Sequence, residues 1–184
     1  MTKVLIEQQP DVFLVVTGEG PAEESLRKLA KTLVIENNVK FIGYLDRNKE
    51  LSACYQSADI FVFASKSETQ GLVLLEAMAQ ATPVVAIAEL GTASILVEGQ
   101  GASIAEDDTV KFAEKVRQLL MNPEERFELG LRAKDYVLTQ WTARLQAEHK
   151  LKFYNQLINV KSVRNPDAQF TGPQADGQQV NVEF

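Results

Sequence analysis

Short apolar runs alternate with helix-forming segments over the first half of the chain, and this alternation limits the possible folds more than any other feature. The runs span residues 11–17, 39–43, 59–64 and 83–87, with a last brief one at 102–104. Continuous apolar runs of this length suit strands that are buried on both faces. Strands that alternate with helices predict an α/β fold, with a parallel sheet and helices on both of its faces.

Helices are expected between these runs and after them. The segment from Ala22 to Glu36 carries leucines at three- and four-residue spacing, and a second helix is expected from Gly71 to Gln80. Asp46 is expected to cap a helix that ends near Ser57, and either Asp107 or Asp108 to cap one that begins at Thr109. Further helices are expected to start at Asn122-Pro123 and at Thr142, whereas residues 92–97 are ambiguous.

Composition and length indicate one soluble domain. The 184 residues suit a single lobe over 1–160, followed at 161–184 by a flexible polar tail rich in Gln, Asn, Gly, Asp and Pro. A net charge of −6 without a Lys/Arg cluster argues against nucleic acid as a partner. The single cysteine, Cys54, excludes an intrachain disulfide and favours a reduced, cytoplasmic compartment. The sequence shows neither a signal peptide nor an apolar run long enough to span a membrane.

Three polar loops follow the predicted strands at the edge of the sheet where ligands of parallel α/β proteins bind. They run from Gly18 to Pro21, from Gly43 to Arg47 and from Ser65 to Gly71. The third loop leads directly into an apolar helix and carries the most informative polar residues. A binding site is therefore expected at this edge, with the third loop at its centre.

The third loop and its helix can hold an anion between two carboxylates. A helix that begins near Gly71 offers unpaired N–H groups and the positive end of its dipole, which favour phosphate. Glu68, before the helix, can accept hydrogen bonds from sugar hydroxyls, with Thr69 and Gln70 beside it. Glu76, more than one turn into the helix, can bind vicinal hydroxyls on a group attached to the phosphate. This order fits a nucleotide-sugar.

Each of these residues also has a plain structural interpretation. A glutamate near a helix start often caps the helix, and an exposed one is usually only solvated. Lys66 is expected to be a solvated loop lysine, and Cys54 a small core residue. Trp141 is expected to anchor packing, and His149 to lie on the surface of the last helix.

The stretch SKSETQGLVLLEAMAQATPVVA resembles the signature of the retaining family 4 (group 1) glycosyltransferases, which have the two-lobed GT-B fold of Rossmann-like lobes. The signature is a pair of glutamates with seven residues between them, a glycine third after the first acid, an E-A-M/L-A helix and a P-V-V strand. It is matched by Glu68, Gly71, Glu76, Ala77, Met78, Ala79, Pro83, Val84 and Val85. The family's G-x-G-P, V-x-F-L-G and Y-x-x-A-D-x-F-V motifs have counterparts at 18–21, 39–43 and 55–62. The resemblance covers roughly Pro10 to Leu157, and the variant at 68–71 looks most like glycolipid-forming members such as diacylglycerol glucosyltransferases.

The resemblance implies a role for each part of the site. Glu68 is the catalytic candidate and would contact the donor sugar, while Glu76 would bind the ribose hydroxyls. The base would pack near the loop that starts at Gly43, and the diphosphate would bind the backbone after Glu68. The binding residues implied in this way are Gly18, Gly20, Gly43, Tyr44, Leu45, Thr69, Gln70, Gly71, Leu72, Val73 and Glu76. The family needs no metal and no cofactor, and the donor is expected to be a UDP-sugar first and a GDP-sugar next.

The chain is short for a whole GT-B enzyme. It resembles the C-terminal, donor-binding lobe without its first strand, so that residues 1–9 would be the end of that lobe's first helix. The partner would be the missing N-terminal acceptor lobe, through which the protein would also reach the cytoplasmic face of a membrane. The basic loop that neutralises the diphosphate has no counterpart here. We therefore expect weak donor binding and no hexose transfer to a lipid or glycan acceptor by this chain alone.

Two other functions stay open. One is a non-catalytic module that keeps the fold and binds a nucleotide or a protein. The missing parts favour it, and the intact pair of Glu68 and Glu76 disfavours it. The other is a different Rossmann-like enzyme, such as a sugar-nucleotide epimerase of GT-B shape. It would need another set of acids and histidines, and the single histidine, His149, is expected on the wrong helix for it.

Overall fold

A computed structural model describes residues 1–47 and 49–164 of the chain, with side chains up to residue 158. The described part divides into two units, the first of which covers residues 1–142 and the second of which begins at Ala143. The second unit contains the helix α7, Ala143–Arg164, whose start agrees with the one expected at Thr142. Most of the expected polar tail lies outside the described residues.

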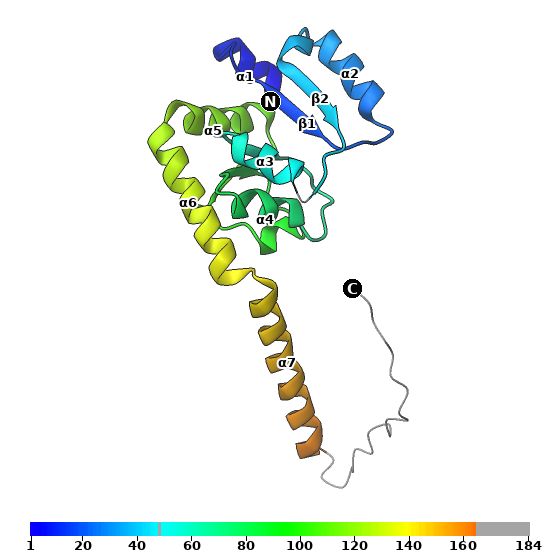
Figure 1. Cartoon of the computed structure of the whole chain (residues 1–184), viewed down its shortest axis with the longest axis vertical. Coiled ribbons are helices and arrows are strands. Elements are labelled where there is room, and N and C mark those ends of the chain that lie inside the picture. Colours follow the sequence, from blue (N-terminus) through cyan, green and yellow to red (C-terminus); the bar gives the residue numbers. More distant parts are fainter. Residues whose placement is uncertain (48, 165–184) are drawn as a thin grey trace. The chain divides into compact units, whose positions relative to one another are not determined.

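The first unit alternates strands and helices as the sequence predicts (Figure 1). Its strands are β1 (Leu14–Thr17), β2 (Val39–Gly43), β3 (Phe61–Phe63), β4 (Val84–Ala86) and β5 (Ala102–Ile104). Its α-helices are α1 (Thr2–Gln8), α2 (Glu23–Thr32), α3 (Glu50–Ser57), α4 (Leu72–Ala79), α5 (Thr109–Met121) and α6 (Pro123–Gln140). Short 3-10 turns lie at η1 (Glu36–Asn38) and η2 (Thr92–Ser94), the latter within the segment that the sequence left ambiguous. All strand pairs are parallel.

The five strands form two sheets instead of the single expected sheet. One has the order β1-β2 and the other the order β3-β4-β5, so β1, β2, β3 and β5 each have an edge that pairs with no other described strand. The apolar strands beside these edges are only partly buried. Val15 of β1 is 47% exposed, whereas every residue of the central strand β4 is fully buried. The two sheets therefore both end in an open, partly apolar edge.

Helices cover both faces of the three-stranded sheet, as predicted. Val84 and Ala86 of β4 point to a cluster that contains Leu74 and Met78 of α4 and Ala133 of α6. The residue between them on β4 points the other way, into a cluster made by residues of α1 and α5: Leu5, Val85, Phe112, Ala113 and Val116. Burying a leucine or methionine side chain contributes about 1.5–3 kcal/mol, so the two clusters on either side of β4 are the main source of stability.

Two of the three predicted capping positions, those of α5 and α6, are occupied by a capping side chain. Asp108 accepts hydrogen bonds from the N–H groups of Val110 and Lys111 at 2.9 and 2.8 Å, so it, and not Asp107, caps α5. Asn122 caps α6. The prediction for Asp46 was wrong, because α3 begins only after Lys49. Asp46 instead closes the turn before the helix.

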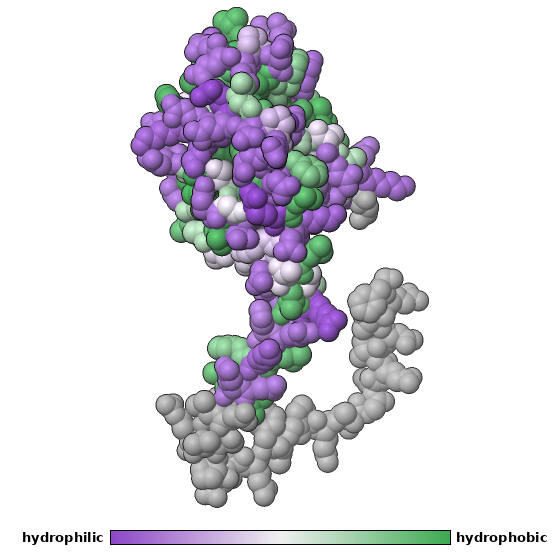
Figure 2. All heavy atoms as spheres, turned by 90° about the vertical axis from the view of Figure 1, so that its left-hand side faces the viewer, coloured by the Kyte–Doolittle hydropathy of each residue, from purple (hydrophilic) through white to green (hydrophobic). Residues whose placement is uncertain are grey.

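The surface of the first unit mixes polar and apolar side chains. The face in Figure 2 is mostly hydrophilic, with separate hydrophobic patches. Among the exposed apolar residues are Phe13 before β1, which is 61% exposed, and Tyr44 after β2, which is 70% exposed. No helix in the described part of the chain is long and apolar enough to cross a membrane.

Candidate functional site

The loop between β3 and α4 is held in shape by Glu68. Its Oε1 atom accepts hydrogen bonds from the N–H groups of Gln70 and Gly71, at 2.9 and 3.0 Å. These two bonds, with Gln70 as the larger cause, lower the pKa of Glu68 below its ordinary range. The carboxylate of Glu68 therefore closes the turn that leads into α4, although it does not cap a residue of the helix itself. The same carboxylate stands at the carboxyl end of β3, where the sequence placed it.

Gly71 is the residue that turns this loop into α4. It adopts a left-handed conformation with φ of 64°, which favours glycine. A Cβ atom there would lie 3.1 Å from Ile95 and from Leu74, so the space on that side belongs to the protein interior. The positive φ and the lack of space for a Cβ atom both explain why residue 71 is glycine. The close approach of a ligand to this backbone stays a prediction.

Two backbone donors are left over at the start of α4. Glu68 takes the N–H groups of Gln70 and Gly71, and the N–H of Leu74 donates to the carbonyl of Gly71 at 3.0 Å. Within the described residues, the N–H groups of Leu72 and Val73 donate to no acceptor. Free N–H groups in the first turn of a helix are what an anion binds. Of the expected phosphate-binding residues, only Leu72 and Val73 therefore have a free N–H group. Those of Gln70 and Gly71 become free only if the side chain of Glu68 moves away.

Glu76, the second glutamate, lies one turn further along α4 and has two neighbours. Arg47, from the loop after β2, forms an ion pair with its Oε1 atom. The buried Tyr55 on α3 lines the same cavity as Glu76. Burial, followed by the nearby charge of Glu76, raises the pKa of Tyr55 to about 12. Glu76 therefore joins α4 to the loop after β2 and lies beside Tyr55 of α3.

Neither neighbour of Glu76 was identified from the sequence as a site residue. Arg47 stood at the end of a polar loop, and Tyr55 stood inside the Y-x-x-A-D motif without a role of its own. Together with Glu76 they line a shallow cavity of about 190 Å³ between α3 and α4. The ion pair between Arg47 and Glu76 could not be predicted from the sequence, because it depends on the conformation of the loop after β2.

The first two polar loops meet beside the ends of β1 and β2. The N–H of Gly18 donates to the carbonyl of Gly43 at 2.7 Å, and both glycines have positive φ angles, of 99° and 71°. Beyond this contact Tyr44 is exposed and Leu45 half-buried, while Gly20 has open space around its Cα atom. The structure thus brings Gly18 and Gly43 together, and no described contact links them to Glu68.

A fourth loop, between β4 and η2, was missed by the sequence analysis and packs against the loop of Glu68. The N–H of Gly91 donates to the carbonyl of Glu68 at 3.1 Å. A Cβ atom at Gly91 would collide with the backbone of Thr69. The next residue, Thr92, is fully buried and fixes its own turn by accepting from the N–H of Glu89 at 2.9 Å. The conformation of the Glu68 loop therefore depends on glycine at position 91.

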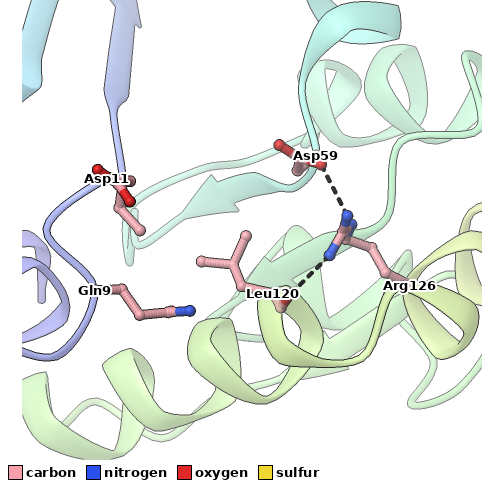
Figure 3. Close-up of a pocket in the computed structure, with 6 residues that line it drawn as sticks. Gln9, Asp11, Asp59, Leu120 and Arg126 are labelled. Carbon is pink, nitrogen blue, oxygen red and sulfur yellow. Dashed lines mark hydrogen bonds and ion pairs between the residues drawn. The ribbon is translucent and has the colours of Figure 1, made fainter.

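The larger cavity of the first unit, of about 310 Å³, lies at the opposite ends of the strands (Figure 3). It opens between the segments that precede β1 and β3, where Asp11 and Asp59 stand. Arg126 reaches into it, pairs with Asp59 at 3.0 Å and donates to the carbonyl of Leu120 at 3.0 Å. Parallel α/β proteins bind ligands beyond the carboxyl ends of their strands, so we assign the site to the loops of Glu68 and Glu76 despite their smaller cavity.

The remaining candidates have structural surroundings. Lys66 is not simply solvated, because it pairs with Asp107 at 2.5 Å, which raises its pKa. Trp141 packs against the cluster around Leu74 and Met78, as expected of an anchor. Cys54 is a partly buried free thiol on α3, and His149 is exposed on α7. Among the described residues, no three potential ligands gather as a metal site requires.

The Glu68 loop should respond to pH. Because the pKa of Glu68 is lower in the folded loop than in an unfolded chain, the carboxylate stabilises the loop above the ordinary pKa of 4.5, and this is lost as pH falls through the lower folded value. We expect the amide signals of Gln70 and Gly71 to titrate with a midpoint below 4.5 in ¹⁵N NMR spectra. Glu68→Gln should abolish this titration, whereas the exposed control Glu89→Gln should keep it. A midpoint at or above 4.5 would contradict the role of Glu68 in holding the loop.

Comparison with known proteins identifies the family. The profile described as Glycosyl transferases group 1 matches residues 1–136, so the chain belongs to this family of glycosyltransferases. A relative is N-acetyl-alpha-D-glucosaminyl L-malate synthase of Bacillus anthracis, 31% identical over 159 residues, which make up 85% of this chain and 41% of that enzyme. Alpha-monoglucosyldiacylglycerol synthase of Streptococcus pneumoniae is 42% identical over 82 residues, 45% of this chain and 18% of that protein.

Solved structures confirm the fold. The S. aureus protein TarM, crystallised as its G117R mutant with fondaparinux, alpha-GlcNAc-glycerol and UDP, superposes with a TM-score of 0.74 at 24% identity. The match covers 83% of this chain and 31% of TarM. The predicted α/β fold and the resemblance to group 1 glycosyltransferases, glycolipid-forming members among them, are thus confirmed. The chain spans less than half the length of each of these three proteins.

Proposed function

We propose that this chain is the donor-binding lobe of a retaining glycosyltransferase and that it binds a nucleotide-sugar for transfer of a hexose to a lipid or glycan acceptor. The observation that carries the proposal is the start of α4. There Glu68 and Glu76 flank two free backbone donors, Leu72 and Val73, beyond the carboxyl end of a parallel strand. Two carboxylates suit hydroxyl groups and free N–H groups suit phosphate, so the arrangement matches a sugar, a diphosphate and a ribose in that order.

Each residue then has a role in donor binding. The diphosphate binds the N–H groups of Leu72 and Val73, and those of Gln70 and Gly71 once the carboxylate of Glu68 turns to the sugar hydroxyls. Glu76 binds the ribose hydroxyls. The remaining donor contacts come from the loop beside the base and from neighbours of the phosphate: Gly18, Gly20, Gly43, Tyr44, Leu45 and Thr69. Glu68 acts by positioning the sugar and by its charge, and the anomeric configuration is retained.

The open edges of the two sheets support a longer enzyme. Ile6 of α1 packs into the same cluster as Ala30 of α2, so α1 and α2 cover the same face of β1 and β2. Crossovers between parallel strands are right-handed, and the step from β1 through α2 leads to β2. A strand that enters through α1 on the same face must therefore lie on the other side of β1, at its open edge. We propose that such a strand, and an acceptor lobe before it, complete the enzyme in the cytoplasm and carry any contact with a membrane surface.

A nucleotide titration tests the donor site. We would record ¹⁵N NMR spectra of the chain with UDP, GDP and ADP up to millimolar concentration. One nucleotide should shift the amides of residues 43–45 and 68–76, and Glu76→Ala should weaken its binding about 10- to 100-fold, because hydrogen bonds to charged groups contribute about 1.5–3 kcal/mol. Glu76→Gln keeps the size of the side chain and separates binding from folding.

The control and the contrary outcome are equally specific. Glu128→Ala removes an exposed glutamate of α6, away from the site, and should bind like the wild type. Shifts without any effect of the Glu76 variants would place the nucleotide elsewhere. No shift with any nucleotide would favour a non-catalytic module. We expect no sugar transfer by this chain alone, and sustained turnover with a UDP-sugar would refute that expectation.

A further inference from the structure

The carboxylate that we assign to ribose binding is already paired with a cation of the protein itself. Arg47 forms an ion pair with Oε1 of Glu76, and Tyr55 lines the cavity beside the same side chain. A carboxylate has two oxygens, and a vicinal diol uses both when each hydroxyl donates to one of them. The guanidinium on Oε1 therefore takes up the space from which one of the two ribose hydroxyls would donate to that oxygen.

The position of Arg47 is fixed by its backbone neighbours. The N–H of Asp46 donates to the carboxylate of Glu50 at 2.8 Å, and the N–H of Lys49 donates to the side chain of Asp46 at 3.2 Å. The N–H of Leu51 donates to the carbonyl of Asp46 at 2.9 Å. These bonds anchor the turn that carries Arg47 to the start of α3. Its side chain is thus held within reach of Glu76 while staying 68% exposed to water.

We propose that Arg47 sets the donor affinity of the site by covering Glu76 until ribose displaces it. The inference rests on the proposed function, because it takes Glu76 as the ribose ligand. Glu76 is only 25% exposed, and Arg47 lies on its solvent side, so a diol arriving from solvent meets the guanidinium first. Arg47 is the charged partner that has to leave Oε1 when the ribose hydroxyls bind there.

The ion pair is weak enough to be displaced. Exposed ion pairs contribute little to stability, and removing the competitor should strengthen ligand binding by about two- to fivefold. A cation that served only to attract the diphosphate would have the opposite effect, because its loss would weaken binding. The sign of the change in affinity therefore decides between the two roles.

The experiment compares wild type, Arg47→Ala and Lys40→Ala by NMR titration with UDP and with 2′-deoxy-UDP. Lys40→Ala removes one positive charge from the exposed side of β2, with no described contact to Glu76. We expect Arg47→Ala to bind UDP about two- to fivefold more tightly than wild type. The gain should be smaller for 2′-deoxy-UDP, which offers Glu76 one hydroxyl instead of two. Lys40→Ala should bind no more tightly than wild type.

The outcomes separate this inference from the proposed function. Wild-type binding of UDP with equal or weaker binding by Arg47→Ala overturns the role of Arg47 and leaves the donor site intact. Absence of UDP binding in every variant overturns both. A ligand-free measurement tests the pair itself: the Nε–Hε signal of Arg47 should shift in Glu76→Gln and not in Glu128→Ala, and an unchanged signal would show that the pair does not form.

Discussion

Replacing Gly101 with alanine is expected to cost about 2–5 kcal/mol of folding free energy, the largest single effect that we foresee. Gly101 precedes β5 with φ of 89°, in a region that strains any residue with a Cβ atom. The added Cβ would also collide with the backbone of Ala133, which is fully buried on α6. Because Ala133 belongs to the cluster beneath α4, neither side has room to move. Thermal unfolding should show a fall in Tm of roughly 5–15 °C.

A matched glycine separates the two causes. Gly99 also has a positive φ, of 79°, but no atom lies within 4 Å of the Cβ position. Gly99→Ala should therefore show only the backbone strain, about 1–2 kcal/mol. Equal losses of stability in the two variants would mean that the contact with Ala133 contributes nothing and that α6 can shift away.

The elements and their order could be predicted from the sequence because apolar runs and helical spacing are local. β5 was predicted with its observed bounds, and α4 differs from its prediction by one residue at each end. The two sheets could not be predicted in the same way. Which strands pair depends on residues that are far apart in the sequence. The apolar runs of β1 and β3 indicate only that these strands are buried on both faces. An apolar run predicts a strand but not which strands lie beside it, and the structure leaves one edge of β1 and one edge of β3 unpaired with any described strand.

The residues of the candidate site also fall into two groups, those predicted from local spacing and those that the sequence did not reveal. Glu68, Gly71 and Glu76 were predicted because their spacing along one helix start is fixed by local geometry. Arg47 and Gly91 were missed because each acts across a gap in sequence, the first by an ion pair with Glu76 and the second by contact with the loop of Glu68. No periodicity or capping rule marks such positions. Only the folded arrangement of four loops shows that they belong to the site.

Replacing Gly91 with alanine should damage the site far more than the fold. Gly91 has φ of −61°, so alanine adds no backbone strain there. Its Cβ atom would collide with the carbonyl group of Thr69 and push away the loop that holds Glu68. Overpacking of this kind costs about 1–3 kcal/mol, whereas a displacement of about 1 Å in a binding loop can reduce function up to about 100-fold. We expect UDP affinity to fall at least about 10-fold while the protein still unfolds cooperatively.

The amide signals of Gln70 and Gly71 make this test independent of any ligand. Both groups donate to Glu68, so a displaced loop must change their chemical shifts and the pH at which they titrate. Glu128→Ala is the control, because Glu128 is exposed on α6 and lies away from the site. If Gly91→Ala left the shifts and the affinity for UDP unchanged, the fourth loop would be a neighbour of the site and not its support. If the shifts and the affinity for UDP both changed while the amide shifts of β4 did not, Gly91 would determine the shape of the donor site without contacting the donor.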